Sequence, residues 1–111
     1  MTEDTARNYD EGKVRFELIP PDALTEVAKV FTYGAAKYTT PEHDGSRNWE
    51  LPGLSEERHL GSLLRHIIAD WSGEKIDPES GQSHMAMVAT RALMILHKRL
   101  EAGCTAKSVS M

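Results

Sequence analysis

The chain has 111 residues, a length that suits one domain with a single hydrophobic core. Its net charge of -4 argues against a nucleic-acid partner, because proteins that bind nucleic acid normally present a basic face. No apolar run approaches the roughly 18 residues of a membrane span, which argues against a membrane partner. Because the N-terminus also lacks a signal-peptide core and Cys104 has no second cysteine to pair with, we expect a cytoplasmic protein.

The two ends of the chain differ from its middle. Residues 1–11 are polar and acidic, and residues 104–111 are small and polar, so both ends are expected to be disordered. Residues 12–103 are expected to form a single domain. Alternating apolar and charged residues at 12–20 predict a short extended lead-in to it.

The first helix is predicted over residues 22–38. The sequence Pro20-Pro21-Asp22 is typical of a helix start. The apolar residues that follow at helical spacing are Leu24, Val27, Ala28, Phe31, Ala35 and Tyr38.

Residues 39–53 are rich in Pro, Gly, Asp and Ser, a composition that predicts a loop. At about fifteen residues it is long for a compact helical protein, and long ordered loops are often functional. Trp49 favours an ordered loop, because a tryptophan usually packs against something. A floppy connection is the alternative.

A second helix is predicted over residues 55–72. Ser55 is a good N-cap, and two glutamates follow it at the positive end of the helix dipole. The expected buried stripe consists of Leu60, Leu63, Leu64, Ile67, Ile68 and Trp71. His59, His66 and Asp70 share one edge of this helix, at the border of that stripe, where a ligand or metal could be held between helices. Ordinary packing at a helix interface is the alternative.

The third helix is predicted from Ser80 or Ser83 to Ala102, with Gly103 after it. Its expected core face consists of Met85, Val88, Ala89, Ala92, Ile95, Leu96 and Leu100. Met87 and Met94 add a second apolar stripe, which suggests burial against another subunit; contact with the first helix within one chain is the alternative. The expected fold class is all-α, a bundle of three main helices completed by dimerisation or assembled as a homotetramer.

A polar stretch connects the second and third helices. If these helices pack antiparallel, its Gly/Pro-marked turn brings His66 and His84 towards one end and leaves three carboxylates in the connection. They are Glu74, Asp77 and Glu79. Hard divalent cations take carboxylate oxygens and imidazole fills remaining positions, so the stretch predicts a metal site that handles phosphate. The alternative is a structural turn in which Asp77 and Ser80 cap the third helix.

Several short motifs follow one another in the chain: GKVRFELIP at 12–20, YGAAKY at 33–38, NW at 48–49, RH at 65–66, GEKIDPESG at 73–81, and then His84. In order and spacing they resemble the phage-associated dATP/dGTP diphosphohydrolase family, the MazZ-like proteins. The resemblance covers residues 12–100. It implies a MazG-like enzyme that cleaves a purine (deoxy)nucleoside triphosphate to the monophosphate and pyrophosphate, encoded by a phage or prophage and acting in the host cytoplasm.

The sequence departs from this resemblance at two points. MazG-like enzymes usually carry an E-x-x-E helix followed by an E-x-x-D helix, and this chain lacks that pair. The family pattern also has a histidine where this chain has Met87.

For such an enzyme, phosphate chemistry assigns roles to the motif residues. Mg²⁺ or Mn²⁺ would be bound by His66, Glu74, Asp77, Glu79 and His84. Glu79 is the expected general base, and Asp77 and Arg65 complete the catalytic set. Phosphate, sugar and base would be held by Lys13, Arg15, Lys37, Tyr38, Asn48, Trp49 and Arg91. The alternative function is a non-catalytic module, for nucleotide binding or for helical assembly.

Overall fold

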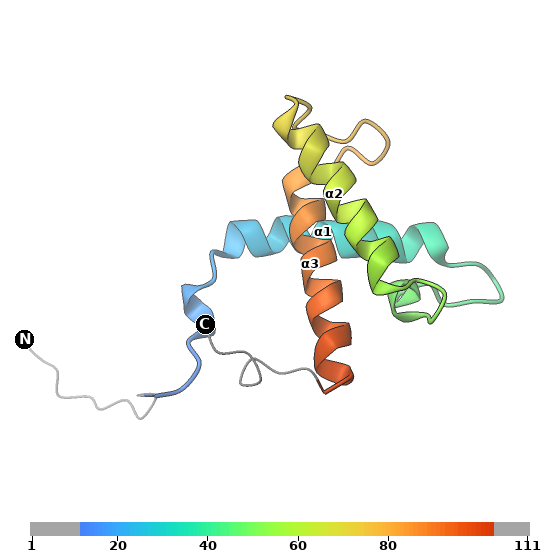
Figure 1. Ribbon diagram of the computed structural model, residues 1–111, viewed down its shortest axis with the longest axis horizontal. Helices are drawn as coiled ribbons and strands as arrows, with labels where there is room; N and C mark the ends of the chain where they lie inside the picture. Colours follow the sequence, from blue (N-terminus) through green and yellow to red (C-terminus); the bar gives the residue numbers. More distant parts are fainter. Residues whose placement is uncertain (1–11, 104–111) are drawn as a thin grey trace, which may run out of the picture.

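The computed structural model describes residues 12–103, and this range is all-α (Figure 1). Its elements are η1 (Phe16–Leu18), α1 (Pro21–Tyr38), η2 (Asn48–Glu50), α2 (Glu56–Trp71) and α3 (His84–Glu101). No β-strand is present in this range, so the all-α class with three main helices is confirmed, while completion of the bundle by dimerisation stays a prediction. The disorder expected for residues 1–11 and 104–111 lies outside the described residues.

Local capping signals explain where the helices begin. Pro21 occupies the first position of α1, where its missing N–H costs no hydrogen bond. The hydroxyl of Ser55 accepts a hydrogen bond from the backbone N–H of Arg58 at the start of α2. The hydroxyl of Ser83 does the same for the N–H of Ala86 at the start of α3.

The expectation that Asp77 and Ser80 cap the third helix is therefore wrong. These residues belong to a turn that is closed before α3 begins: Ile76 and Ser83 form an isolated β-bridge, and the Asp77 N–H donates to the Gln82 carbonyl at 2.8 Å. Gly81 completes the turn with φ +73°, a conformation that favours glycine. Helix α3 begins directly after the bridge, so its N-cap is Ser83.

Figure 1 shows α2 and α3 as an antiparallel pair, with α1 crossing them at a steep angle. The buried side chains come from all three helices and include several polar ones. They are Val27, Ala86, Met94, Ile95, His59, Ser62, His84 and Thr90. None of the helices in the described range combines the length and the apolar character needed to cross a membrane.

The expected core faces are only partly buried, which corrects the sequence analysis. Residues predicted to be buried but found exposed are Leu60, Leu64, Ile68 and Trp71 on α2, and Met85, Ala92, Leu96 and Leu100 on α3. The reason is geometric: α1 covers the pair along one side only, so an apolar stripe on another side has no described neighbour to pack against. Met94 is buried and Met87 half-buried within the single chain, so the alternative of contact within one chain accounts for this stripe, and its burial against another subunit stays a prediction.

Candidate functional site

A cleft of about 480 Å³ lies between α1, the loop before α2, and the α2–α3 pair. That volume falls within the range of small-molecule sites. Many of the sequence-predicted site residues line it. They are Lys37, Tyr38, Asn48, Trp49, Arg65, His66, Asp77, Glu79, His84 and Arg91. Residues more than fifty positions apart thus come together, because the α2–α3 hairpin folds back against the end of α1.

Three of the predicted residues do not line the cleft. Lys13 and Arg15 are exposed in the segment before α1, where Arg15 forms an ion pair of 2.9 Å with Glu17. Glu74 lies outside the cleft and contacts it indirectly, through His84.

His66, His84 and Glu74 form a hydrogen-bonded row. The two histidine Nδ1 atoms lie 2.8 Å apart, and Nε2 of His84 lies 2.8 Å from a carboxylate oxygen of Glu74. Because a carboxylate only accepts, we assign the proton on His84 to Nε2. A neutral His84 then accepts from Nδ1–H of His66, which leaves Nε2 of His66 as an acceptor. Burial is the main reason why the pKa of His66 lies below its ordinary value, which favours that neutral ring.

The cleft carboxylates have structural partners. Oδ2 of Asp77 accepts hydrogen bonds from the backbone N–H and the hydroxyl of Ser80, at 3.2 and 2.7 Å. Partial burial would raise the pKa of Asp77, but these hydrogen bonds outweigh it and hold the pKa below its ordinary value. Glu79 is exposed and lies 3.4 Å from Nζ of Lys37. Asp77 therefore has a structural role within the turn before α3, although it does not cap that helix.

Arg91 is oriented by a residue that the sequence analysis did not assign to the site. Nη1 of Arg91 lies 2.7 Å from Nδ1 of His59, and Nε2 of His59 lies 3.0 Å from the carbonyl of Trp49. Because a guanidinium only donates, His59 must accept at Nδ1 and donate from Nε2, which makes it a neutral ring. Burial lowers the pKa of His59 in agreement with this assignment. The position of His59 seven residues before His66, on the same helix edge, was the available signal.

Trp49 is packed between α1 and α3. Its ring meets Phe31 edge-on at 6.0 Å between centroids and His97 edge-on at 5.5 Å. The guanidinium of Arg47 lies over it at 5.2 Å. The loop that carries Trp49 is therefore ordered, as the tryptophan suggested, and it presents an aromatic surface to the cleft.

Comparison with known proteins identifies the family. A family model described as "dATP/dGTP diphosphohydrolase, N-terminal" matches residues 3–107. The chain belongs to this family. A protein named dATP/dGTP diphosphohydrolase, from Salmonella phage PMBT28, is 34% identical over 91 residues, which are 82% of this chain and 29% of that protein. The chain thus spans less than a third of the length of this curated relative, and no solved structure matches it.

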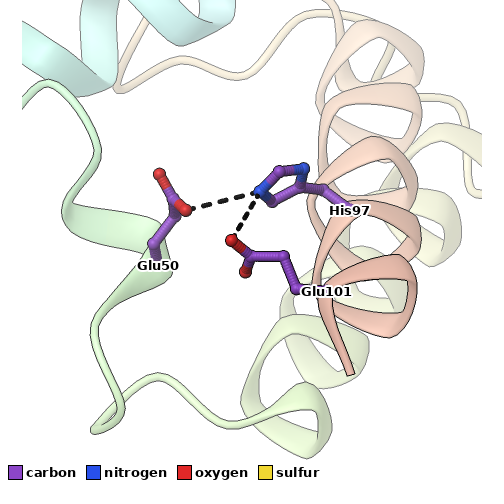
Figure 2. A group of neighbouring side chains, drawn as sticks. All are labelled: Glu50, His97 and Glu101. Atoms are coloured by element: carbon purple, nitrogen blue, oxygen red, sulfur yellow. Dashed lines mark ion pairs between the residues drawn. The ribbon is translucent and has the colours of Figure 1, made fainter. Parts of the chain in front are cut away.

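In this member of the dATP/dGTP diphosphohydrolase family, three potential metal ligands converge at a place that the sequence analysis did not single out. Within residues 12–103, the group whose ligand atoms all lie within 4.8 Å of one another is Glu50, His97 and Glu101 (Figure 2). The predicted cleft ligands do not converge in this way. The cleft offers the carboxylates of Asp77 and Glu79, and Mg²⁺ is commonly held by one or two carboxylates together with the phosphates of a nucleotide.

Proposed function

We propose that this chain is a metal-dependent (deoxy)nucleoside triphosphate diphosphohydrolase domain that cleaves dATP and dGTP to the monophosphate and pyrophosphate. Membership of the family, and the name of the phage relative, support this class of reaction. The observation that carries the proposal for this chain is the charge arrangement of the cleft. Two guanidinium groups, of Arg65 and Arg91, line it, and neither has a carboxylate partner among the described residues.

An arginine without a carboxylate partner in a cleft favours a phosphate-bearing ligand. Arg91 is half-buried, and its burial lowers its pKa, which is the direction expected for a cation that lacks an anionic neighbour. Its described hydrogen-bond partner, His59, is neutral and leaves that charge uncompensated. A triphosphate would supply the missing negative charge and accept forked hydrogen bonds from both guanidiniums.

The other cleft residues divide the remaining tasks. Trp49 offers a ring for stacking on the base, and Asn48 beside it offers amide groups that can hydrogen-bond the base edge. Lys37 and Tyr38 lie at the end of α1 and can contact phosphate or sugar. Because His59 contacts both the Trp49 carbonyl and Arg91, the element that holds the base is connected directly to an arginine that holds phosphate.

Glu79 is the proposed general base. Water attacks the α-phosphorus, the bond from that phosphorus to the oxygen bridging to the β-phosphate breaks, and pyrophosphate leaves with the bridging oxygen. Glu79 is exposed to solvent and takes the proton of the attacking water. Asp77 and Glu79 are the residues that would hold Mg²⁺ or Mn²⁺, an ion that offsets phosphate charge and makes a bound water more acidic.

A non-catalytic nucleotide-binding module is the second candidate. It is favoured by the engagement of both cleft carboxylates, Asp77 with Ser80 and Glu79 with Lys37. Met87 also lines the cleft, and it adds no ligand for a hard cation. Such a module would bind the same nucleotides through Arg65 and Arg91 without turnover.

The decisive experiment incubates the purified chain with Mg²⁺ or Mn²⁺ and each common NTP and dNTP, and resolves the products by ion-exchange chromatography. We expect monophosphate plus pyrophosphate from dATP and dGTP, and a loss of turnover of about 100-fold or more in Glu79→Gln. Binding of a non-hydrolysable dATP analogue is measured in parallel by calorimetry. Arg91→Lys should weaken that binding about tenfold, because lysine keeps the charge but not the fork.

The matched control is Arg58→Lys, which changes an exposed arginine on α2 outside the cleft and should leave binding unchanged. Diphosphate plus phosphate as products would contradict the proposed cleavage. Binding without turnover under either metal would identify the non-catalytic module. Neither binding nor turnover would leave a helical assembly module as the better description.

A further inference from the structure

A second cluster of ligand-type side chains lies outside the cleft, where η2 meets the last turns of α3. His97 and Glu101 are one turn apart on α3, and Glu50 is the last residue of η2. Nε2 of His97 lies 3.4 Å from Oε1 of Glu50 and 3.4 Å from Oε2 of Glu101. Figure 2 shows both carboxylates directed at this nitrogen from two sides.

The His97 nitrogen is not satisfied by these contacts. Nε2 is buried, and within the described chain it has no hydrogen-bond partner. A protonated imidazole between two carboxylates would hydrogen-bond them at about 2.7–2.9 Å. Metal–ligand bonds of about 2.0–2.1 Å at the tetrahedral angle instead place two ligand atoms about 3.3 Å apart. Both observed spacings, of 3.4 Å, are closer to the second of these values than to the first.

We propose that Glu50, His97 and Glu101 bind a divalent transition-metal ion of the zinc class, which fastens η2, and with it Trp49, to the end of α3. One imidazole and two carboxylates suit Zn²⁺, with water at the fourth position, better than they suit Mg²⁺, which prefers oxygen ligands alone. This site is separate from the cleft carboxylates and does not depend on the proposed enzymatic activity.

The surroundings of the cluster prepare it for a cation. Arg47 holds the second carboxylate oxygen of Glu50, so Oε1 remains free for a metal in a fixed direction. Nζ of Lys98 donates to the carbonyls of Glu50 and Leu54, at 3.4 and 3.2 Å, so the backbone of η2 already rests on α3 before any metal binds.

The consequence for the cleft follows from the position of Trp49. Its ring lies edge-on against the His97 ring, and the preceding and following residues belong to the same short helix. A metal that joins Glu50 to His97 fixes η2 through a side chain, in addition to the backbone contact that Lys98 already makes. The ion acts as a structural clamp on the aromatic wall of the cleft.

The test uses Zn²⁺ and Co²⁺ salts alone as probes on the chelator-stripped chain. The chain has two tryptophans, so a Trp71→Phe background leaves Trp49 as the only reporter. We expect saturable binding of one ion per chain, quenching of Trp49 fluorescence by Co²⁺, the visible spectrum of tetrahedral Co²⁺, and a rise in melting temperature with Zn²⁺. His97→Asn should weaken Co²⁺ binding by about 100-fold or more.

Two further variants keep the test falsifiable. Glu101→Gln alters an exposed side chain and should weaken binding about tenfold or more without unfolding the chain, which circular dichroism verifies. Glu79→Gln, in the cleft, should leave Co²⁺ affinity and its spectrum unchanged. Absence of Zn²⁺ and Co²⁺ binding, or binding that persists in both His97→Asn and Glu101→Gln, would overturn the site. Loss of binding in Glu79→Gln alone would place the ion in the cleft instead.

Discussion

Gly45 is the residue at which the loop before α2 touches the end of α1. A Cβ at this position would lie 2.2 Å from the carbonyl carbon of Tyr38 and 2.5 Å from the backbone nitrogen of Thr39. The Gly45 N–H also donates to the Thr39 hydroxyl at 2.9 Å. Because backbone atoms of a helix end cannot move aside as a flexible side chain can, only glycine allows this approach. Gly45 lines the cleft, so the approach also sets the distance between α1 and η2.

We therefore expect Gly45→Ala to destabilise the chain by about 1–3 kcal/mol, through overpacking against backbone. Urea unfolding followed by circular dichroism measures the free energy of unfolding. Gly53→Ala is the matched control: it lies in the same loop with nothing within 4 Å of the added carbon, and should change stability by no more than about 0.5 kcal/mol. Equal effects of the two substitutions would show that the contact between the loop and α1 is not a tight one.

At the scale of single elements, sequence predicted the helices better than their faces. The predicted helix at 22–38 is observed as Pro21–Tyr38, and the one at 55–72 as Glu56–Trp71, because proline, serine caps and apolar spacing are local signals. Which side of a helix is covered depends instead on how α1 crosses the pair, and no local signal records that. Leu64 and Ile68 have the spacing of core residues and are exposed.

For the candidate site too, local motifs predicted residues but not the contacts between them. Sequence motifs identified residues such as Arg65, His66 and Asn48 that share one cleft, although their roles stay predictions. Contacts between distant segments were not accessible: His59 meets Arg91 across 32 positions, and Glu50 meets His97 through tertiary packing alone. The sequence around Glu50 contains no signal that this residue contacts His97, so the cluster at the end of α3 could be found only in the structure.

The edge of α2 that carries His59 predicts a pH dependence of stability. His59 is fully buried, with Arg91 on one ring nitrogen, the Trp49 carbonyl on the other, and the charge of Lys98 nearby. Its pKa is lower in the folded chain than the ordinary 6.5, chiefly because of burial. The unfolded chain therefore binds more protons between the two values. The contribution of His59 to the free energy of unfolding is therefore fully present above about pH 6.5, and it is lost as the pH drops from there towards the pKa of His59 in the folded chain.

Urea unfolding between pH 8 and pH 5 should show this loss, and His59→Gln should make the profile flatter. The same variant should cost about 1–3 kcal/mol at pH 8, because it disturbs buried hydrogen bonds to Arg91 and Trp49. His43→Gln, which replaces an exposed histidine, serves as the control and should leave the slope unchanged. A slope that is identical in His59→Gln and the unchanged chain would mean that His59 is not the group responsible.

At the scale of the whole molecule, the exposed side of the α2–α3 pair is too apolar for a surface that meets only water. On α2, Leu64, Ile68 and Trp71 are 52%, 57% and 86% exposed, and they recur at helical spacing along one edge. On α3, Leu93, Leu96 and Leu100 are exposed as well. Exposed apolar residues that gather along a helix edge in this way are typical of an interface. A second copy of the chain is the partner we propose, because a stripe along one helix can pair with itself about a two-fold axis.

Light scattering coupled to size-exclusion chromatography should then give about twice the chain mass of 12.4 kDa. The double substitution Leu64→Asp and Ile68→Asp should yield a folded monomer. A charge at the centre of an apolar interface strongly weakens association, whereas at a position that is exposed in the monomer it changes folding stability little. Thr32→Asp, on an exposed position of α1, should stay dimeric. A tetramer lost in the same double variant would mean that this stripe forms one of two interfaces. A monomer for the unchanged chain would assign the stripe to another occupant, such as a further segment of a longer protein, since the chain spans 29% of its phage relative.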